Sequence, residues 1–519
     1  MRLNEGVNPE LIIRLRSDLD DAGYRNEAIS ERLGAEAEEA LGREHTVPAA
    51  RAIDRRRRAG ERDALDVLID LVLRSRPIDR TDVGLAFPTL GADGATEAGI
   101  LASGEGADAS ERWRAALDVH PYAFSDHLGD GHWWILSDVG ERAVGGALPE
   151  DHVLGVGGAS LTLAGITVPT PVDTVLDLGT GCGIQAMHAS RTARRVVATD
   201  VSPRAVEIAR ANAALNGIAN IEVRLGSLFA PVAGETFDRI VTNPPFVITP
   251  RVDGVPVYDY RDGGMVGDAL VEAVVRGTAA HLAPGGTAQL LGNWEYSPSS
   301  DGLSRVGGWV QGLGLDAWVV EREHLDPAFY AETWIRDGGT RAGTAEFDRL
   351  TDAWLDDFEA RRVTGVGFGF VTLRRPTDSR RPVVVRLERV TGSLDTAGLG
   401  IHIAECLDAI DWAAGLDDDE LGAAPLVVAP DVTVEHHFRP GDDDPTAILL
   451  RQGQGFRRAI SASTALAALV GASDGTLTVR AIVDAVAQLM EVDAHALAAE
   501  TVPDVRRLIA DGILRPVAG

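Results

Sequence analysis

Four consecutive residues near the middle of the chain, Asn243-Pro244-Pro245-Phe246, carry the groups needed to hold a planar NH2 group. The side-chain oxygen of Asn243 can accept a hydrogen bond from such a group, and the carbonyl of Pro244 can accept a second one. Proline fixes the backbone and carries no N–H that would compete for these acceptors. Phe246 supplies a ring that can stack on a planar group. A plain proline turn after a buried strand would contain the same residues.

A glycine-rich turn upstream of this motif distinguishes between the two interpretations. It reads Asp177-Leu178-Gly179-Thr180-Gly181-Cys182-Gly183, with a predicted strand at 174–176 before it and the predicted start of a helix at 184–187. Glycines allow positive φ and let the backbone approach a ligand closely. Nicotinamide and flavin enzymes use a similar turn. Its combination with the N-P-P-F tetrapeptide after the predicted strand 238–242 favours methyl transfer to nitrogen.

On these two motifs, residues 172–292 resemble the class I S-adenosylmethionine-dependent methyltransferases. Within that superfamily they are similar to the branch with an N-P-P-(Y/F) motif, which methylates glutamine amides or exocyclic base amines. The resemblance implies S-adenosyl-L-methionine as cofactor and a catalytic motif formed by Asn243, Pro244, Pro245 and Phe246. No strong base is required, because the proton can leave after the transfer.

The resemblance also implies where the cofactor binds. The glycine turn would pass under its methionine part, where the helix N-terminus adds a favourable dipole for negative charge. Asp200 would accept hydrogen bonds from the ribose hydroxyls, unless it is an ordinary helix N-cap, and Val201 would pack on the adenine. Ser227 stands where the family usually has an acidic residue, and it is a weaker acceptor. The expected cofactor-binding residues are Asp177, Gly179, Thr180, Gly181, Gly183, Asp200, Val201, Ser227, Leu228 and Asn243.

A polar, aromatic-rich loop at 258–264 follows the N-P-P-F motif. It is expected at the carboxyl edge of the sheet, where ligands bind in open α/β folds. We therefore expect substrate contacts from Phe246, Tyr258, Tyr260 and Arg261, the alternative being that the loop packs on itself.

The predicted fold class is α/β, with a Rossmann-like, doubly wound sheet of the class I methyltransferase kind. Alternating strands and helices predict a mostly parallel sheet covered on both faces. The strands are expected at 173–178, 195–200, 220–224, 237–242, 286–292, 316–321 and 366–374, the last one antiparallel.

A chain of 519 residues is too long for one ordinary core, so several domains are expected. Residues 1–150 are predicted to be mainly helical with a β-hairpin, 151–377 to form the methyltransferase domain, and 378–519 to form an acidic α+β domain with a winged-helix-like end. In the first region, helices are expected at 26–42, 47–58 and 61–74, no regular element at 78–110, and hairpin strands at 115–119 and 132–136. In the last, helices are expected at 461–470, 479–490 and 494–511.

Composition limits the possible partners. The net charge of −29 argues against nonspecific binding to nucleic acid, which needs positive potential. With only Cys182 and Cys406, neither a disulfide framework nor a zinc site made of thiolates is available, and we expect no metal. No apolar run approaches the ~20 residues of a membrane span, and the first residues lack a basic-then-apolar signal. These features predict a cytoplasmic protein without a membrane partner.

The leading functional hypothesis is an N-methyltransferase acting on a planar NH2 group of a protein or RNA substrate. A protein glutamine, as in a translation factor, is favoured by the acidic charge and by the order of parts, which is similar to that of release-factor glutamine methyltransferases. The alternatives are a ribosomal-RNA, tRNA or DNA base, to which phenylalanine at position 246 also points, and a small molecule. From a different class comes a non-catalytic cofactor-binding scaffold.

Overall fold

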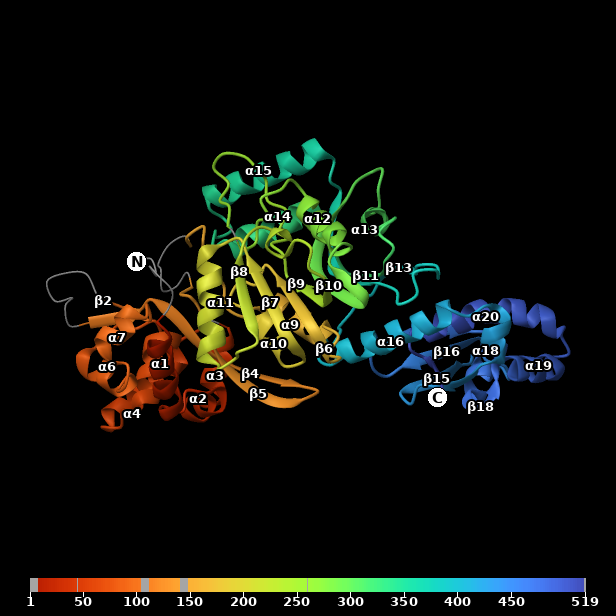
Figure 1. Cartoon of the computed structure of the whole chain (residues 1–519), viewed down its shortest axis with the longest axis horizontal. Helices are drawn as coiled ribbons and strands as arrows, with labels where there is room; N and C mark the ends of the chain where they lie inside the picture. The colour runs from red at the N-terminus through yellow and green to blue at the C-terminus, as the bar shows by residue number, and fades with distance from the viewer. Residues whose placement is uncertain (1–7, 44, 104–111, 141–147, 259, 518–519) are drawn as a thin grey trace.

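The computed structural model describes residues 8–43, 45–103, 112–140, 148–258 and 260–517. Figure 1 shows three units: an N-terminal unit (red to orange), a central domain (yellow to teal) and a C-terminal unit (blue). The long helix α16 (Leu399–Ala414) leads from the central domain into the C-terminal unit. None of the helices in the described ranges is long and apolar enough to cross a membrane.

An eight-stranded sheet forms the middle of the central domain, in the order β13-β11-β12-β10-β9-β6-β7-β8. All seven predicted strands are confirmed, and β12 runs antiparallel to both neighbours, as predicted. The edge strand β13 was not predicted; it lies beyond residue 377, where the sequence suggested a domain boundary, and pairs in parallel with β11. The strands are β6 (Val172–Leu178), β7 (Ala193–Asp200), β8 (Ile221–Leu225), β9 (Phe237–Thr242), β10 (Leu282–Tyr296), β11 (Asp316–Leu325), β12 (Gly365–Arg374) and β13 (Val385–Arg389).

Helices cover both faces of this sheet, which explains why its inner strands are apolar at consecutive positions. Val196 and Val197 of β7 are both fully buried, and they belong to different apolar clusters on the two faces. One face carries α9 (Gly158–Ile166), α10 (Ile184–Ser190) and α11 (Pro203–Leu215); the other carries α12 (Ala269–Thr278) and α13 (Gly302–Val310). A short 3-10 turn, η3 (Ala230–Val232), follows β8.

The N-terminal unit differs from the sequence prediction in two places. The predicted helix 26–42 is two helices, because Gly34 adopts φ 81° between them. The segment 78–110 contains regular elements, since Asp18 of α1 accepts hydrogen bonds from the N–H groups of Thr89 and Leu90 (both 2.9 Å) and so fixes the start of α7. The elements are α1 (Pro9–Asp21), α2 (Asn26–Leu33), α3 (Ala35–Gly42), α4 (Val47–Arg58), α5 (Ala64–Leu68), η1 (Ile69–Leu73), β1 (Ile78–Asp79), α6 (Arg80–Ala86), α7 (Gly91–Glu97), β2 (Leu101–Ser103) and β3 (Arg112–Ala115).

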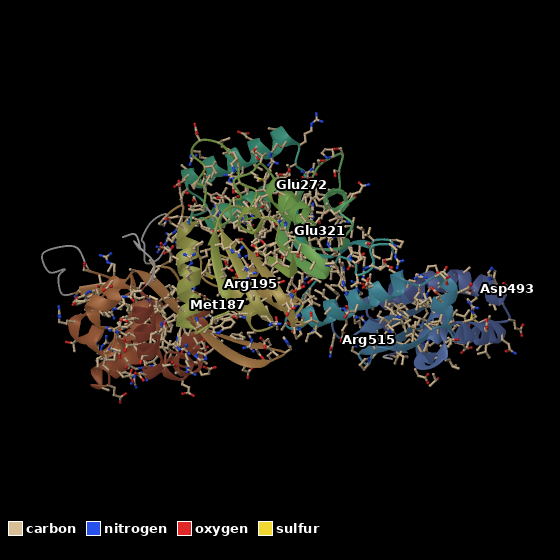
Figure 2. The ribbon with its side chains drawn as sticks, in the orientation of Figure 1. Met187, Arg195, Glu272, Glu321, Asp493 and Arg515 are labelled. Atoms are coloured by element: carbon tan, nitrogen blue, oxygen red, sulfur yellow. The ribbon has the colours of Figure 1, made fainter. Side chains whose placement is uncertain are left out.

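The predicted hairpin is confirmed as β4 (Leu117–Asp126) and β5 (Gly129–Asp138). Two asparagines one turn apart pair with the backbone of β5: Asn212 on α11 with the N–H and C=O of Leu136, and Asn216 at the C-cap of α11 with those of Trp134 (2.7–3.0 Å). Met187 of α10, labelled in Figure 2 where the hairpin meets the central domain, is buried in the N-terminal apolar cluster. The N-terminal unit is therefore packed firmly onto one helical face of the sheet.

Two helices missed by the sequence analysis, α14 (Pro327–Asp337) and α15 (Ala345–Arg361), lie between β11 and β12 in the chain. They stand at the top of the central domain in Figure 1. Four apolar residues at helical spacing give α15 a buried face, namely Phe347, Leu350, Trp354 and Phe358. This face packs in one cluster with Val247 and Ile248, which directly follow the N-P-P-F motif.

The C-terminal unit contains the three helices predicted there, at 464–472, 479–490 and 494–510. Its sheet β18-β14-β19 takes its central strand from upstream of these helices. Arg386 and Glu388 of β13 form ion pairs with Asp511 and Arg458, which join the unit to the central sheet. The elements after α16 are α17 (Asp418–Ala423), β14 (Pro425–Val428), β15 (Val432–His437), β16 (Ala447–Gln452), β17 (Ala459–Ala462), α18 (Thr464–Ala472), β18 (Asp474–Thr478), α19 (Val479–Met490), α20 (Ala494–Ala510) and β19 (Leu514–Pro516).

Candidate active site

The glycine turn connects β6 to α10 at the carboxyl edge of the sheet. Gly179, Gly181 and Gly183 have φ values of 74°, 55° and 89°, a region that side-chain-bearing residues rarely adopt. The N–H groups of Gly179 and Thr180 both donate to the carbonyl of Thr199 at the end of β7 (2.9 Å). A Cβ atom at position 179 or 181 would meet nothing within 4 Å. The turn is therefore fixed to the end of β7, and it leaves open space beside Gly179 and Gly181 for a ligand.

Asp177 fixes this turn from the end of β6. Its Oδ2 accepts hydrogen bonds from the hydroxyl of Thr180 (2.6 Å) and from the N–H of Ala186 (2.9 Å). Its Oδ1 has no hydrogen-bond partner among the described residues. Burial raises the pKa of the Asp177 carboxyl to about 7. A buried acceptor without a donor is unfavourable, so this oxygen would be stabilised by a positively charged ligand group.

Asp200 joins the turn to the start of α11. Its two carboxylate oxygens accept hydrogen bonds from the N–H groups of Gly181 and Ser202 (both 2.9 Å). The N-cap of α11 is Ser202, whose hydroxyl accepts from Ala205, so Asp200 is not the helix cap that the sequence also allowed. Val201 is 63% exposed at the same edge of the sheet. This pair fits a nucleoside, because the apolar side chain can pack on the base and the carboxylate can accept hydrogen bonds from the sugar hydroxyls.

The loop after β8 carries the predicted residues Ser227 and Leu228. Ser227 is exposed, and Leu228 adopts a left-handed conformation with φ 48°. The N–H of Gly226 donates to the carbonyl of Asp200 (2.8 Å), which holds the loop against the end of β7. Non-glycine residues in this conformation are costly and occur preferentially at functional sites. The loop therefore borders the same space as Asp200 and Val201.

The N-P-P-F motif lies directly beside the glycine turn. β6 and β9 are parallel neighbours with Asp177 opposite Val241, and the hydroxyl of Thr242 donates to the carbonyl of Leu178 (2.7 Å). This register places Asn243 next to Gly179, one strand away. The side-chain oxygen Oδ1 of Asn243 is buried and lacks a hydrogen-bond partner within the described part of the chain. The tertiary structure thus brings the two motifs together and leaves the asparagine acceptor available for a donor.

Phe246 lies among aromatic side chains that the sequence analysis missed. Its ring centroid is 5.5 Å from that of Phe368 on β12 and 6.3 Å from that of Trp334 on α14. All three rings are half-buried, so each retains exposed surface. The sequence contained a signal for α15 in its apolar spacing, but none that would bring Trp334 to this motif. The three rings form an aromatic wall beside Asn243.

The loop residues proposed for substrate contact differ in their exposure. Tyr258 and Arg261 are buried, with the guanidinium of Arg261 4.7 Å from the Tyr258 ring centroid. Arg261 also donates to the carbonyl of Trp334 (2.8 Å), which ties the loop to α14. Tyr260 is half-buried and its ring lies 6.0 Å from that of His152. These contacts favour a positioning role for Tyr258 and Arg261, and a direct contact for Tyr260.

Comparison with known proteins agrees with this geometry over the same part of the chain. Residues 157–306 match the family model of the methyltransferase small domain. The match spans β6 to β10 and contains both the glycine turn and the N-P-P-F motif. The N-terminal unit and the C-terminal unit match two further models, each described as a domain of unknown function: DUF7059 at residues 21–116 and DUF7782 at residues 404–516.

Relatives of the methyltransferase domain are named as enzymes acting on protein or on RNA. The release factor glutamine methyltransferase of Cereibacter sphaeroides is 41% identical over 127 residues, which is 22% of this chain and 45% of the relative. The ribosomal protein uL3 glutamine methyltransferase of Bradyrhizobium diazoefficiens is 34% identical over 155 residues (28% and 47%). The ribosomal RNA small subunit methyltransferase C of Escherichia coli is 32% identical over 154 residues (29% and 40%). The chain thus spans less than half the length of each of these relatives.

Oxygen acceptors and aromatic rings gather at the carboxyl edge of the central sheet. Among the described residues, no group of three or more His, Cys, Asp or Glu side chains is placed to hold a metal ion. The groups that converge at the carboxyl edge are oxygen acceptors and aromatic rings: Asp177, Asp200, Asn243, Phe246 and Trp334. Such a set can bind a cationic nucleoside and orient an N–H donor.

Proposed function

We propose that this protein is an S-adenosylmethionine-dependent N-methyltransferase whose acceptor is a planar NH2 group, with a protein glutamine as the favoured target. The observation that carries the proposal is the unpartnered, buried Oδ1 of Asn243, one strand away from the open glycine turn. An acceptor in this place serves no hydrogen bond within the described residues, and a substrate N–H would satisfy it.

The residues of the turn fit the cofactor by charge and shape. Asp177 offers an unpartnered acceptor to the cationic amino group of the methionine part, and the open space over Gly179 and Gly181 leaves room for it. Asp200 offers a carboxylate to the ribose, and Val201 offers exposed apolar surface to the adenine. When bound, S-adenosylmethionine supplies a methyl group made electrophilic by its sulfonium.

The chain's own residues then orient the nucleophile. Asn243 accepts one substrate N–H, and the carbonyl of Pro244 accepts the other, which fixes the NH2 group and its lone pair. As positive charge develops on nitrogen, these two acceptors stabilise it more strongly than they stabilise the neutral group, which is an electrostatic transition-state effect. The ring of Phe246 stacks on the planar group. The proton leaves after the transfer, so the site needs no strong base.

Two features support a protein as the favoured target. The solvent-exposed face of α15, next to the loop that follows Asn243, is acidic, and a net charge of −29 repels bare RNA. The exposed acidic residues of α15 are Glu346, Asp348, Asp352, Asp356 and Glu359, against the exposed Arg349 of the same helix. Two of the relatives reported above are named glutamine methyltransferases.

A nucleobase in RNA is the second candidate, and the aromatic wall favours it. Three half-exposed rings, those of Phe246, Trp334 and Phe368, can stack on a base. One relative is named a ribosomal RNA methyltransferase. Both candidates require the same methyl transfer at Asn243, so they differ only in the molecule that presents the NH2 group.

The deciding experiment is incubation of the full chain with tritiated S-adenosylmethionine and a bacterial lysate, followed by separate protease and nuclease digestion. Label that only protease releases, located on glutamine by mass spectrometry, supports the favoured target. Label that only nuclease releases supports a base. The variant Asn243→Ala is the control in each arm: label that persists in it would contradict the proposed site.

A further inference from the structure

A large cavity of the central domain lies at the amino edge of the sheet, opposite the candidate active site. It has a volume of about 840 Å³ and is formed by the segments that enter β6, β7, β9 and β10, together with the tip of the hairpin at His127 and Leu128. Ligand cavities commonly have volumes of about 300–1,000 Å³. The cavity is thus large enough for a small ligand.

The lining of this cavity is basic although the chain is acidic. Four arginines and two aspartates line it, whereas the whole chain carries a net charge of −29. Asp238 accepts hydrogen bonds from the N–H and the hydroxyl of Thr174 (2.8 and 2.9 Å), and the exposed Asp173 forms an ion pair with Arg194 (3.5 Å). Arg191, Arg194 and Arg374 each form an ion pair with an aspartate. Arg239 is thus the arginine of the lining that forms no ion pair among the described residues.

Arg239 is the central residue of this lining. It is 1% exposed on β9, and no carboxylate oxygen of the described residues lies within ion-pair distance (4.0 Å) of its guanidinium. Burial lowers the pKa of Arg239 to about 10. Its Nε has no hydrogen-bond partner in the described ranges, and the same is true of Nε of Arg374, which lines the same cavity. Asp238 opposes the lowering of the Arg239 pKa only through space, and a buried cation without an ion pair is costly, so a bound anion would stabilise this part of the fold.

Threonine hydroxyls connect Arg239 to the open part of the cavity. The guanidinium donates to the hydroxyl of Thr170 (3.3 Å) and to that of Thr192 (3.1 Å). Thr170 is exposed, and its hydroxyl hydrogen is directed to no acceptor in the described structure. A hydroxyl that accepts from a cation is a better donor to an anion, because hydrogen bonds in a chain polarise one another. The hydroxyl of Thr192 already donates to the carbonyl of Ala189 (3.4 Å), so Arg239 can act on an anion through Thr170.

We propose that this cavity is a binding site for a phosphate group, with Thr170 and the arginines of the lining as its donors and Arg239 as the residue that positions and polarises Thr170. Arginine and hydroxyl donors match the several acceptor oxygens of a phosphate. The phosphate belongs either to a small molecule or to the backbone of an RNA. The site is separate from the methyl-transfer site, so the proposal does not depend on the proposed activity.

The test is isothermal titration calorimetry of the full-length protein at constant ionic strength with three probes: inorganic phosphate, adenosine 5′-monophosphate and a short single-stranded RNA. We expect saturable binding of phosphate, weakened about tenfold or more in Thr170→Val, since a hydrogen bond to a charged group contributes at least that factor. Arg239→Met should weaken binding as well, because it removes the cation that polarises the Thr170 hydroxyl. The matched controls are Arg58→Met and Thr433→Val, two exposed positions outside the cavity, which should bind phosphate as the unchanged protein does.

The variant Thr170→Val changes an exposed residue, so the test remains decisive if Arg239→Met does not fold. Tighter binding of the monophosphate than of RNA would assign the site to a small molecule, and the reverse would assign it to a nucleic-acid backbone. Absence of saturable binding of all three probes to the unchanged protein would overturn the proposal. So would equal phosphate affinity of the unchanged protein and Thr170→Val.

Discussion

The two edges of the central sheet present opposite chemistry. At the carboxyl edge, the two motifs present acceptors without partners in the described structure, Oδ1 of Asp177 and Oδ1 of Asn243. At the amino edge they are donors, Nε of Arg239 and Nε of Arg374. One edge therefore suits a cationic cofactor and an N–H donor, and the other suits an anion.

This difference shows how unsatisfied polar groups point to ligands. Buried polar groups in folded proteins almost always have hydrogen-bond partners. A buried acceptor without a partner therefore indicates a ligand with a donor, and a buried donor without a partner indicates a ligand with an acceptor. The carboxyl edge also carries the glycines with positive φ and an open space above the turn, whereas the amino edge carries a cavity lined by threonines and arginines. The backbone thus shapes the first site, and side chains shape the second.

The largest expected effect is a difference in unfolding free energy between variants of two buried arginines. Arg381 forms close ion pairs with Asp316 and Asp411, and its removal leaves the buried Asp316 without a cationic partner. We expect Arg381→Met to lower the free energy of unfolding by about 3–5 kcal/mol. Arg239→Met removes a cation that has no such partner and should change it by no more than about 1 kcal/mol in phosphate-free buffer. Urea unfolding of both variants measures the difference. Equal losses of unfolding free energy would mean that the fold stabilises the charge of Arg239 as well as it stabilises that of Arg381.

The next effect concerns the acceptor at the carboxyl edge. Asn243→Ala removes the oxygen that holds the substrate NH2 group in the transition state, so the rate of methyl transfer should fall about 10²–10³-fold. The dissociation constant of S-adenosylmethionine should change less than about threefold, because the cofactor contacts come mainly from the glycine turn and Asp200. Single-turnover transfer of tritiated methyl and calorimetry of the cofactor measure the two quantities. An unchanged rate would favour the non-catalytic scaffold.

Asp177 provides a pH-dependent test of the same edge. Its folded pKa of about 7 lies above the ordinary value of 3.8, so the folded chain binds an extra proton between these pH values. The stabilisation from this proton is fully present below about pH 4 and is lost as the pH rises through 7. Relative to Asp177→Asn, the unchanged protein should lose roughly 2–4 kcal/mol of unfolding free energy over that interval.

Chemical unfolding of both proteins between pH 4 and 8 measures this difference. Parallel stability curves would contradict the raised pKa of Asp177. Because the ionised carboxylate is the form that attracts a cationic amino group, the affinity for S-adenosylmethionine should rise with pH through 7 in the unchanged protein and stay flat in Asp177→Asn.

The smallest effect concerns the aromatic wall. Trp334→Ala removes a ring that contacts Phe246, and aromatic pairs contribute about 0.5–1.5 kcal/mol beyond their buried area. We expect KM for the acceptor substrate to rise about 3–10-fold with cofactor affinity unchanged. Phe329→Ala, a half-exposed ring on the same helix, is the matched control and should leave KM unaltered. Equal KM values for both variants would remove Trp334 from the substrate site.

Local chemistry made the sheet and its two motifs predictable. A few consecutive residues are enough to specify an apolar strand, a turn that only glycine adopts easily, or the N-P-P-F tetrapeptide. All seven predicted strands are present. The split of the helix at Gly34 and the helix α7 could not be predicted in this way. The second depends on Asp18, about seventy residues away in the chain, whose carboxylate fixes the start of α7.

The sequence by itself determined that a glycine turn and an asparagine acceptor exist on strands of one α/β domain, because both depend on backbone preferences and short motifs. Only the tertiary structure decided that they lie on adjacent strands, that Trp334 and Phe368 flank Phe246, and that Arg239 is buried without a counter-ion beside a cavity. Strand order, helix insertion and burial arise from contacts between distant segments, and the spacing of residues along the chain does not encode those contacts.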